Sequence, residues 1–565
     1  MQRGSSALAN SNLTYYDKGP ELSRIVALPR RRWTSEIDDE ICRDLTSVVR
    51  KDGGTWELLP TQAGALLEIA EYEGLFGPIA VGAGKTLITL LAPLMVPRVE
   101  RPLLLLPAQL RNQTRNRVLP EMAKQFTLHP NLTIRGYEEM SLEKNKTMLG
   151  DLAPDMIIAD EVHFLKNLKS ARTKRLSRYM QLHPWTIFIG VSGTVANHSI
   201  MDYWHLLHWA LKPANAPLPA NRHTVMTWAR VIDNKVKNEN REPPHKLRML
   251  LDDPFSLYDK PDPRRAIRIA YKNRLIETPG VVATAEVELD TRLVLRKWPI
   301  EFPEVARAAL ETLSKDWRRP DDVEVMDGSE YWSIARTINC GFYLRWLEPG
   351  PKDWMEARRI WSAYCRRRLT YNRSGLDSPK QVEREAETLQ LREWIKWRDI
   401  RESFTPITEI CWLSDFMLEE AAGWLAKNRG IAWVENIGFG TELANRSGVP
   451  YFGAGDDQIL TYRDSCVASI GAHGTGKNLQ QYNRMLFTCP SPRGLVWEQA
   501  LGRMHRQGQQ EDHVIADVFL PAWPATQAMQ GALSNSDYHR DSLGQSRRLL
   551  YCEKKGMDEL WSEEN

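Results

Sequence analysis

Residues 78–95 read PIAVGAGKTLITLLAPLM, and this stretch decides how the first half of the chain is interpreted. A short apolar run, 78–81, is followed by a glycine-containing loop and then by an apolar run of helical length. A strand, a glycine loop and a helix in this order form a cradle for phosphate, because backbone N–H groups and the helix N-terminus face the anion. The stretch therefore predicts a site for a nucleoside triphosphate.

The loop also carries side chains suited to such a site. Lys85 is expected to reach the β- and γ-phosphates, and Thr86 is expected to ligate Mg²⁺. The residues predicted to hold the nucleotide are Gly82, Ala83, Gly84, Lys85 and Thr86. The full G-x-x-x-x-G-K-[ST] pattern is not met, because Ile79 stands five positions before Gly84. A glycine-rich turn that happens to precede a lysine is the alternative interpretation.

A second motif, DMIIADEVH at 155–163, ends an apolar run with two adjacent carboxylates. Placed at a strand end, Asp160 can hold Mg²⁺ through water and Glu161 can polarise an attacking water. Two acids in this position could also serve solvation alone. Combined with the lysine loop upstream, they predict metal-assisted hydrolysis of a γ-phosphate.

Apolar runs of strand length recur in two parts of the chain, separated by stretches long enough for helices. The runs are PIAV, RPLLLLP, DMIIAD and WTIFIGVSG in the first part, and GIAWVEN, VPYFGAG, SCVASIG, RMLFTCP and HVIADVFL in the second. This alternation predicts an α/β fold with two parallel sheets. The expected organisation is an extension at 1–54, α/β regions at 55–210 and 405–525, a helical insert at 211–404, and a polar tail at 526–565.

The insert at 211–404 is rich in tryptophan and arginine. Its tryptophans are 298, 317, 332, 346, 354, 361, 394 and 397. They could stack on unpaired bases, as in single-strand binders. We favour the alternative that they fill the core of a helical region, since large aromatic side chains are mostly buried.

Composition leaves most partners open. The 565 residues carry a formal charge of +3, so any nucleic-acid site must arise from local clustering of basic residues. The seven cysteines include no C-x-x-C pair, which argues against a zinc site or a disulfide framework. No uncharged apolar run approaches the length needed to cross a bilayer, so we expect a cytoplasmic protein with no membrane partner.

Two further motifs are polar. Ser192 and Thr194, in GVSGT, follow a strand-like run and could couple a phosphate site to another domain, although such a sequence is more often a plain turn. In 499–509, QALGRMHRQGQ, the residues Gln499, Arg503 and Arg506 would share one face of a helix. There the two arginines could neutralise charge in a transition state, or simply be solvated.

The ordered set GAGKT, DEVH with FLKN, SGT and QALGRMHRQGQ resembles superfamily-two DEAD/DEAH-box helicases, specifically the Swi/Snf-type double-stranded DNA translocases. The resemblance covers about 55–210 and 405–525. The compact length is similar to bacteriophage and bacterial members of this group. By the same resemblance, Gln62 in LPTQ reads adenine, LPAQL at 106–110 is similar to motif Ia, and GYE at 136–138 is similar to motif Ib.

Residues 469–479, SIGAHGTGKNL, resemble motif V, which in the family contacts the DNA backbone and couples it to ATP. The residues carried over from it are Ser469, Gly474, Gly476 and Asn478. His473 departs from the family, which favours glycine there, and Gly471 stands where a basic residue is usual.

The resemblance implies two RecA-like lobes that bind ATP and Mg²⁺. The catalytic residues would be Lys85, Asp160, Glu161, Gln499, Arg503 and Arg506, with Thr86 and Asp160 on the metal. It implies an ATP-dependent translocase or helicase on duplex DNA. The alternatives are an RNA helicase, and an ATP-gated scaffold that docks a protein partner through the insert.

Overall fold

The fold is described from a computed structural model of the chain. It describes residues 19–31, 39–80, 82–193, 195, 199–234, 236, 238–284, 291–323, 325, 328–348, 350–370, 379–405, 407–506, 508–545 and 547–557. The chain divides into two compact units, which we treat separately. Unit 1 comprises 1–287 with 537–546, and unit 2 comprises 288–536 with 547–565.

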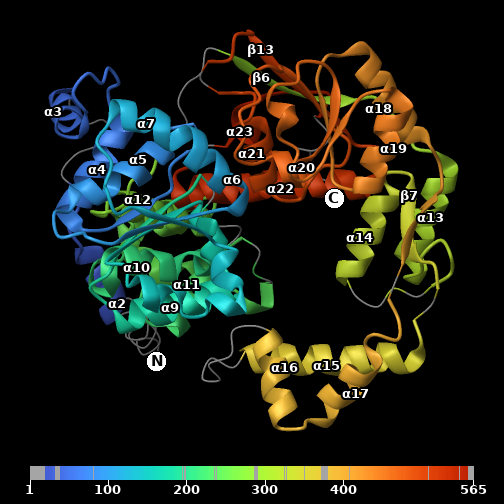
Figure 1. Ribbon diagram of the computed structural model, residues 1–565, viewed down its shortest axis with the longest axis horizontal. Helices are drawn as coiled ribbons and strands as arrows, with labels where there is room; N and C mark the ends of the chain where they lie inside the picture. Colours follow the sequence, from blue (N-terminus) through green and yellow to red (C-terminus); the bar gives the residue numbers. More distant parts are fainter. Residues whose placement is uncertain are drawn as a thin grey trace, which may run out of the picture. The chain divides into compact units, whose positions relative to one another are not determined.

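Unit 1 is built on a five-stranded parallel sheet with the strand order β1-β5-β4-β2-β3. Its strands are β1 (Leu75–Gly77), β2 (Pro102–Leu106), β3 (Thr133–Gly136), β4 (Met156–Asp160) and β5 (Ile187–Val191). Its helices are α2 (Pro20–Ala27), α3 (Asp39–Val49), α4 (Pro60–Tyr72), α5 (Lys85–Leu91), α6 (Ala108–Gln113), α7 (Leu119–Gln125), α8 (Met148–Leu152), α9 (Ala171–Leu182), α10 (Trp204–Asn215), α11 (Arg222–Ile232) and α12 (Pro263–Ile276). Figure 1 shows helices on both faces of this sheet.

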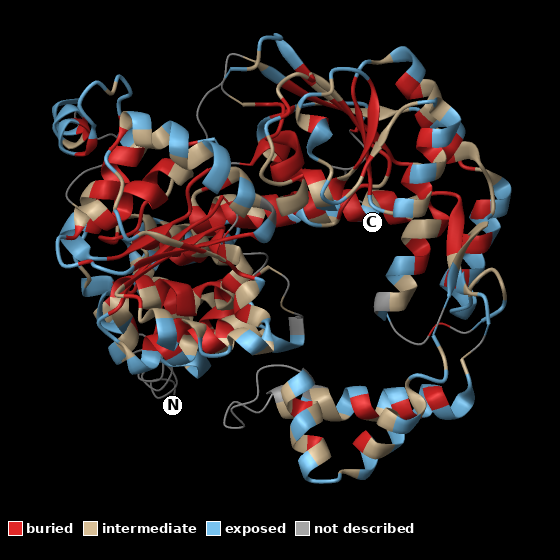
Figure 2. Ribbon diagram, in the orientation of Figure 1, coloured by how far each residue is buried: buried red, intermediate tan, exposed pale blue. Residues whose placement is uncertain are grey.

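The two faces of the unit 1 sheet bury different side chains, because successive residues of a strand point to opposite faces. One core takes Leu103, Leu105, Ile157, Ala159 and Phe188, and the other takes Leu104, Leu106, Met156, Ile158 and Ile189. A strand buried on both faces has an unbroken apolar sequence, which is why LLLL and MIIA are recognisable. Figure 2 shows these central strands as buried, whereas many helical surfaces are exposed.

Unit 2 has a seven-stranded parallel sheet with the order β10-β11-β9-β12-β13-β6-β14, and a separate antiparallel pair β7-β8. Its strands are β6 (Arg292–Trp298), β7 (Phe342–Trp346), β8 (Thr408–Trp412), β9 (Ile431–Val434), β10 (Tyr451–Phe452), β11 (Cys466–Ser469), β12 (Arg484–Phe487), β13 (His513–Phe519) and β14 (Glu553–Lys555). Its helices are α13 (Glu304–Asp316), α14 (Gly328–Ile338), α15 (Lys352–Thr370), α16 (Pro379–Thr388), α17 (Arg392–Ile400), α18 (Phe416–Lys427), α19 (Ile437–Ser447), α20 (Ile470–His473), α21 (Gly494–Leu501) and α23 (Arg548–Tyr551). Helix α22 (Trp523–Leu543) begins in unit 2, and its residues from Asp537 are counted with unit 1.

These sheets confirm the α/β class and the parallel strands expected from the sequence. The strand before the glycine loop differs, because β1 lies at Leu75–Gly77 and not at 78–81. Pairing of Gly77 with Val191 is the last contact of β1 in the ladder. Residues 78–80 have no regular structure, and Val81 lies outside the described residues.

The range 211–404, expected to be one helical insert, is divided between the units. Helices α11 and α12 belong to unit 1, whereas β6 is a strand of the unit 2 sheet. Arg296 of β6 forms a two-pronged ion pair with Asp517 of β13, at 2.7 and 3.1 Å. The residue that neutralises Arg296 lies 221 positions away. The local sequence therefore shows only the charge, which is why it resembles that of a charged helix. The expected tail also has structure, since it includes most of α22, α23 and β14.

Helices α15, α16 and α17 remain as a small helical region of the expected kind. Trp361 and Trp394 are each 5% exposed and lie in a shared core with Val382 and Ala386. Trp354 is also buried and contacts Trp397, with ring centroids 5.3 Å apart. The interpretation of these tryptophans as core is confirmed, although Trp317 and Trp332, elsewhere in the range, are exposed.

A buried acid joins the end of α22 to the rest of unit 1. Asp233 accepts hydrogen bonds from the Tyr538 hydroxyl at 2.8 Å and from the Ile200 N–H at 3.2 Å. Burial raises the pKa of Asp233 to about 7, although these hydrogen bonds lower it. Tyr538 is itself fully buried, so the contact is shielded from water.

The raised pKa makes the stability of unit 1 depend on pH. Between about pH 4 and 7 the folded protein keeps a proton on Asp233 that the unfolded chain releases, so the free energy of unfolding falls as pH rises through this window, by up to about 4 kcal/mol. We expect Asp233→Asn, which retains an acceptor for Tyr538, to flatten the curve of melting temperature against pH between pH 5 and 7. The fully exposed Asp252 provides the matched control, Asp252→Asn. Parallel curves for wild type and Asp233→Asn would show that this acid is not the source.

None of the helices in the described ranges is both long enough and apolar enough to cross a membrane.

Candidate functional site

The glycine loop between β1 and α5 has a backbone that requires glycine. Gly82 and Gly84 adopt φ values of 99° and 75°, which side-chain-bearing residues rarely take. A Cβ atom at Gly84 would lie 1.9 Å from the Gln62 amide nitrogen. The Gln62 side chain therefore fills the space beside Gly84, whereas a Cβ atom at Gly82 would meet no atom within 4 Å.

Gln62, which the resemblance assigns to adenine, lies against this loop. Its Oε1 accepts a hydrogen bond from the Leu59 N–H at 2.9 Å, and its Nε2 lies 3.5 Å from the Gly84 carbonyl. The side chain is 5% exposed. Gln62 thus connects the start of α4 to the loop, and its amide is fixed in orientation.

Lys85 begins α5 and folds back over the loop. Its Nζ donates hydrogen bonds to the carbonyl oxygens of Ile79 at 3.3 Å and Ala80 at 3.0 Å. Helix α5 packs on β4 and β5. The lysine charge acts on both carboxyls: it opposes the rise that burial causes in the pKa of Asp160, and it helps to lower the pKa of Glu161. The two motifs, separated by 75 residues of sequence, therefore form one electrostatic site.

The acid pair stands at the carboxyl end of β4. Asp160 is its last residue and is 6% exposed; its Oδ1 accepts a hydrogen bond from the Glu161 N–H at 3.0 Å. Glu161 has φ 54° and ψ 53°, the left-handed region. A non-glycine residue held there costs about 1–3 kcal/mol, and such outliers concentrate at functional sites. The turn directs Glu161 away from the sheet ladder.

Two side chains hold the Glu161 carboxylate. The Ser192 hydroxyl, just after β5, donates to Glu161 Oε2 at 2.8 Å. His163 Nδ1 lies 3.2 Å from the same oxygen and 3.0 Å from the Ser192 hydroxyl. Asp160 pairs with Val191 in the sheet, which places the residues after each strand side by side. The network thus follows from strand order and register.

In this network Ser192 contacts Glu161 of the acid pair, so its contact lies within unit 1. The part of His163 was missed, although it lies in the quoted DEVH motif. The signal that could have revealed this network is Ser192, a polar residue directly after β5, the strand that pairs with β4. Thr194 lies outside the described residues.

The two acids differ in their pKa shifts. Burial raises the pKa of Asp160, and the neighbouring charge of Glu161 raises it further. Burial also acts to raise the pKa of Glu161, but His163, Lys85 and Ser192 together lower it below its usual value. Glu161 is therefore the carboxylate of the pair that stays ionised.

The donors Thr86 and Asp160 fit Mg²⁺ by type. Both are hard oxygen ligands, and Mg²⁺ is commonly held by one or two carboxylates together with phosphates of the substrate. Across the described ranges, no group of three or more His, Cys, Asp and Glu side chains is arranged to hold a metal ion.

In unit 2 the expectation of one helix face carrying Gln499, Arg503 and Arg506 is wrong. Helix α21 ends at Leu501 with Gly502 as its cap, so both arginines follow the helix in a turn. Arg503 is 6% exposed; it donates from Nε to the Gln499 carbonyl at 2.9 Å and from Nη1 to the Lys477 carbonyl at 3.2 Å. Arg506 is half-buried, and burial lowers its pKa.

The motif-V segment meets the same turn. Thr475 donates its hydroxyl to Gln499 Oε1 at 2.9 Å, and the Arg503 carbonyl accepts from the Leu479 N–H at 3.1 Å. Gly476 has φ 78°, and Asn478 Nδ2 donates to Gln480 Oε1 at 2.8 Å. The structure therefore brings the segment and the arginine turn together, with Thr475 as a connecting residue that sequence reasoning missed.

The other residues of this segment have structural surroundings. Ser469 is the last residue of β11, and Gly474 caps the four-residue helix α20. His473 is fully buried, and its Nε2 lies 2.6 Å from the Gly453 carbonyl. His473, which stands where the family favours glycine, therefore has a place in the core.

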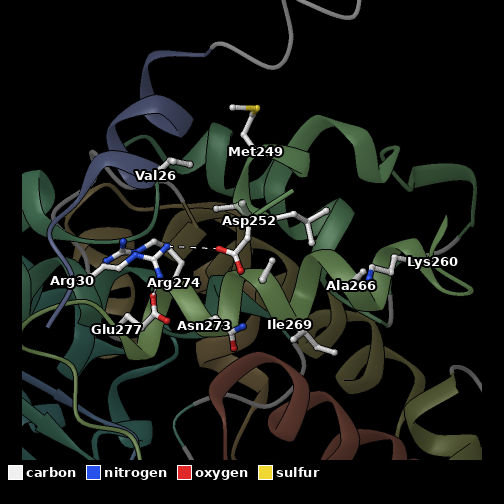
Figure 3. A pocket seen from close by; sticks show the side chains of 13 residues that line it. Val26, Arg30, Met249, Asp252, Lys260, Ala266, Ile269, Asn273, Arg274 and Glu277 are labelled. Carbon is white, nitrogen blue, oxygen red and sulfur yellow. Dashed lines mark hydrogen bonds and ion pairs between the residues drawn. The ribbon is translucent and has the colours of Figure 1, made fainter. Parts of the chain in front are cut away.

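A cavity of about 510 Å³ in unit 1 lies elsewhere. Val26, Arg30 and Asp252 line it together with residues of α12, among them Arg274 (Figure 3). Arg30 pairs with Glu277 at 2.5 Å, whereas Arg274 is buried and donates to the Leu28 and Pro29 carbonyls. None of its lining residues belongs to the glycine loop or the acid pair, so the cavity is separate from the candidate site.

No protein-family model matches the chain, and no curated protein matches it either.

Proposed function

We propose that the protein is a nucleic-acid-stimulated ATPase that translocates on duplex DNA, with two RecA-like lobes corresponding to the two parallel sheets. The observation that carries the hydrolytic part is the packing of α5, which begins at Lys85, on β4, which ends with Asp160 at the carboxyl edge of the unit 1 sheet. Ligands of open α/β sheets bind at this edge.

In this proposal each side chain has a separate task. Glu161 stays ionised and accepts a proton from the attacking water, while His163 and Ser192 keep its carboxylate in place. Lys85, now folded onto the Ile79 and Ala80 carbonyls, is available to transfer its hydrogen bonds to phosphate oxygens. Thr86 and Asp160 would hold Mg²⁺, which supplies charge neutralisation at the phosphates when bound.

The DNA part rests on the resemblance of the ordered motifs to Swi/Snf-type translocases. It is supported by the contacts of Thr475 and Arg503, which join the motif-V segment to the arginine turn in unit 2. In a translocase these segments would sense the nucleic-acid backbone and the nucleotide respectively. Binding to backbone phosphates would be independent of sequence and sensitive to salt.

The test is steady-state ATP hydrolysis by the intact chain with no nucleic acid, duplex DNA, single-stranded DNA or structured RNA, each at the same salt concentration. We expect duplex DNA to increase the rate, and the stimulation to weaken as salt is raised from 50 to 200 mM, about the range over which phosphate contacts lose much of their affinity. Stimulation by RNA alone would favour an RNA helicase. Hydrolysis indifferent to all three would favour an ATP-gated scaffold.

A further inference from the structure

A second cavity, of about 210 Å³, lies at the carboxyl edge of the unit 2 sheet. Glu435 and Asn436, which follow β9, form one part of its wall, and Thr488 and Cys489, which follow β12, form another. Arg336 of α14 and Cys340, in the turn after that helix, also line it. All of these residues belong to unit 2.

The strand order explains why a cavity forms here. From β9 the chain continues through α19 to β10, on one side of β9, and from β12 it continues through α21 to β13, on the other side. Helices α19 and α21 contribute to different cores, with Phe439 in one and Trp497 in the other. A crevice opens where the strand order reverses, outside the carboxyl ends of the strands.

The crevice holds a charged group beside a thiol. Arg336 Nη2 donates to Glu435 Oε2 at 2.6 Å and to the Pro490 carbonyl at 3.2 Å, and it lies 3.5 Å from Cys489 Sγ. Cys489 is half-buried, whereas Cys340 is 6% exposed. Cys489 is thus the thiol that has both a cationic neighbour and access to the cavity.

The two thiols interact and shift in opposite directions. Interaction with Cys340 lowers the pKa of Cys489, and the charge of Arg336 lowers it further, against the effects of burial and of Glu435. The same interaction raises the pKa of Cys340, and burial adds to the rise. Thiolates are the reactive form of cysteine, so the attacking sulfur is that of Cys489.

Other cysteines have the opposite environment. Burial raises the pKa of Cys365 to about 11, of Cys466 to about 12 and of Cys552 to about 11. At neutral pH these thiols remain protonated and unreactive. Selective chemistry at the Arg336 crevice therefore has an electrostatic cause.

We propose that Cys340 and Cys489 form a modification site for low-molecular-weight disulfides, with Cys489 as the attacking thiol and Cys340 as the resolving one. The inference does not depend on the proposed ATPase activity. It rests on a thiol pair at a topological crevice, with Arg336 in contact with one of the two sulfurs.

The reaction takes place in two exchanges. The Cys489 thiolate attacks one sulfur of the small disulfide, a mixed disulfide forms, and the other half leaves as a thiolate that takes a proton from water. Cys340 then loses its proton to water and attacks Cys489 Sγ, which breaks the mixed disulfide and releases the second small thiol. Both protein thiols are oxidised, and the small disulfide is reduced to two thiols.

The experiment treats the intact, reduced chain with oxidised glutathione at neutral pH and maps cysteine states by mass spectrometry without reduction. We expect the Cys340–Cys489 link to form before any other cysteine is modified. Cys340→Ser should accumulate one glutathione, at Cys489. Arg336→Gln should slow that first step, because the neutral amide no longer helps to lower the pKa of Cys489. Cys365→Ser is the matched control and should behave as wild type.

Two results would overturn the inference. One is glutathione appearing first on Cys365 or Cys411; the other is a Cys340→Ser chain, folded by circular dichroism, in which Cys489 takes up none. A measurement on the wild type needs no substitution: limited alkylation with iodoacetamide should label Cys489 ahead of the other cysteines at pH 7. Labelling of Cys489 at the same rate as the others would also contradict the proposal.

Discussion

Glu161→Gln should bind ATP and hydrolyse it about 10²- to 10⁴-fold more slowly than wild type, the range over which a positioned general base contributes. The amide has nearly the same shape as the carboxylate and can still accept the Ser192 hydrogen bond, but it cannot take a proton from water. Binding should persist because Lys85 and the glycine loop are unchanged. The measurements are steady-state hydrolysis and equilibrium binding of a fluorescent ATP analogue.

Two further variants are compared with Glu161→Gln. Glu121→Gln changes an exposed glutamate of α7 and should leave both measurements unchanged. Lys85→Ala should lose nucleotide binding, since it removes the cation of the loop. If Glu161→Gln turned over ATP at the wild-type rate, Glu161 would not be the base, and the hydrogen bonds that hold it would need another explanation.

Glu498→Ala should lower the free energy of unfolding of unit 2 by about 3–5 kcal/mol, because it removes the carboxylate that neutralises a buried arginine. Glu498 and Arg548 form an ion pair in which each side chain is 3% exposed. The Arg548 N–H also donates to Glu498 Oε2 at 2.8 Å, and its guanidinium reaches His505. The pair connects α23 to α21 at the residue before Gln499. Urea unfolding followed by circular dichroism measures the loss.

The exposed pair of Arg446 and Glu442 is the control for this prediction. It is about one-third exposed on both sides, so Glu442→Ala should cost at most about 1 kcal/mol. Replacing both members of the buried pair, by Glu498→Leu with Arg548→Met, should recover much of the loss, because no unpaired charge remains. A double variant as unstable as Glu498→Ala would show that shape, rather than charge, accounts for the effect.

Local sequence was sufficient for most strands, and it singled out residues that the structure places near one another. Runs such as MIIAD and VIADVF form strands because both of their faces are buried, which makes them continuously apolar. Lys85, Asp160 and Glu161 were predicted to act together, and their mutual electrostatic effects place them in one site. The shared use of these residues in catalysis remains a prediction.

The errors arose where distant partners decide the structure. Strand β6 was missed because its charged Arg296 is neutralised by Asp517 of β13. The arginines after α21 were placed on a helix because spacing alone does not reveal that Gly502 ends it. Likewise Arg548, in a tail that looked merely polar, proves to be buried against Glu498. Each case needs a contact between residues far apart or a backbone angle that the sequence pattern does not specify.

The division of α22 has a consequence for how the chain is made on the ribosome. N-terminal domains normally fold while the rest of a chain is still being synthesised. Unit 1 includes residues 537–546, and it needs Leu543 for one of its cores and Tyr538 for Asp233. Its last pieces therefore emerge only after nearly all of unit 2 has been translated. Until then part of the apolar core of the nascent unit 1 stays exposed. We therefore expect a chaperone to bind it during synthesis.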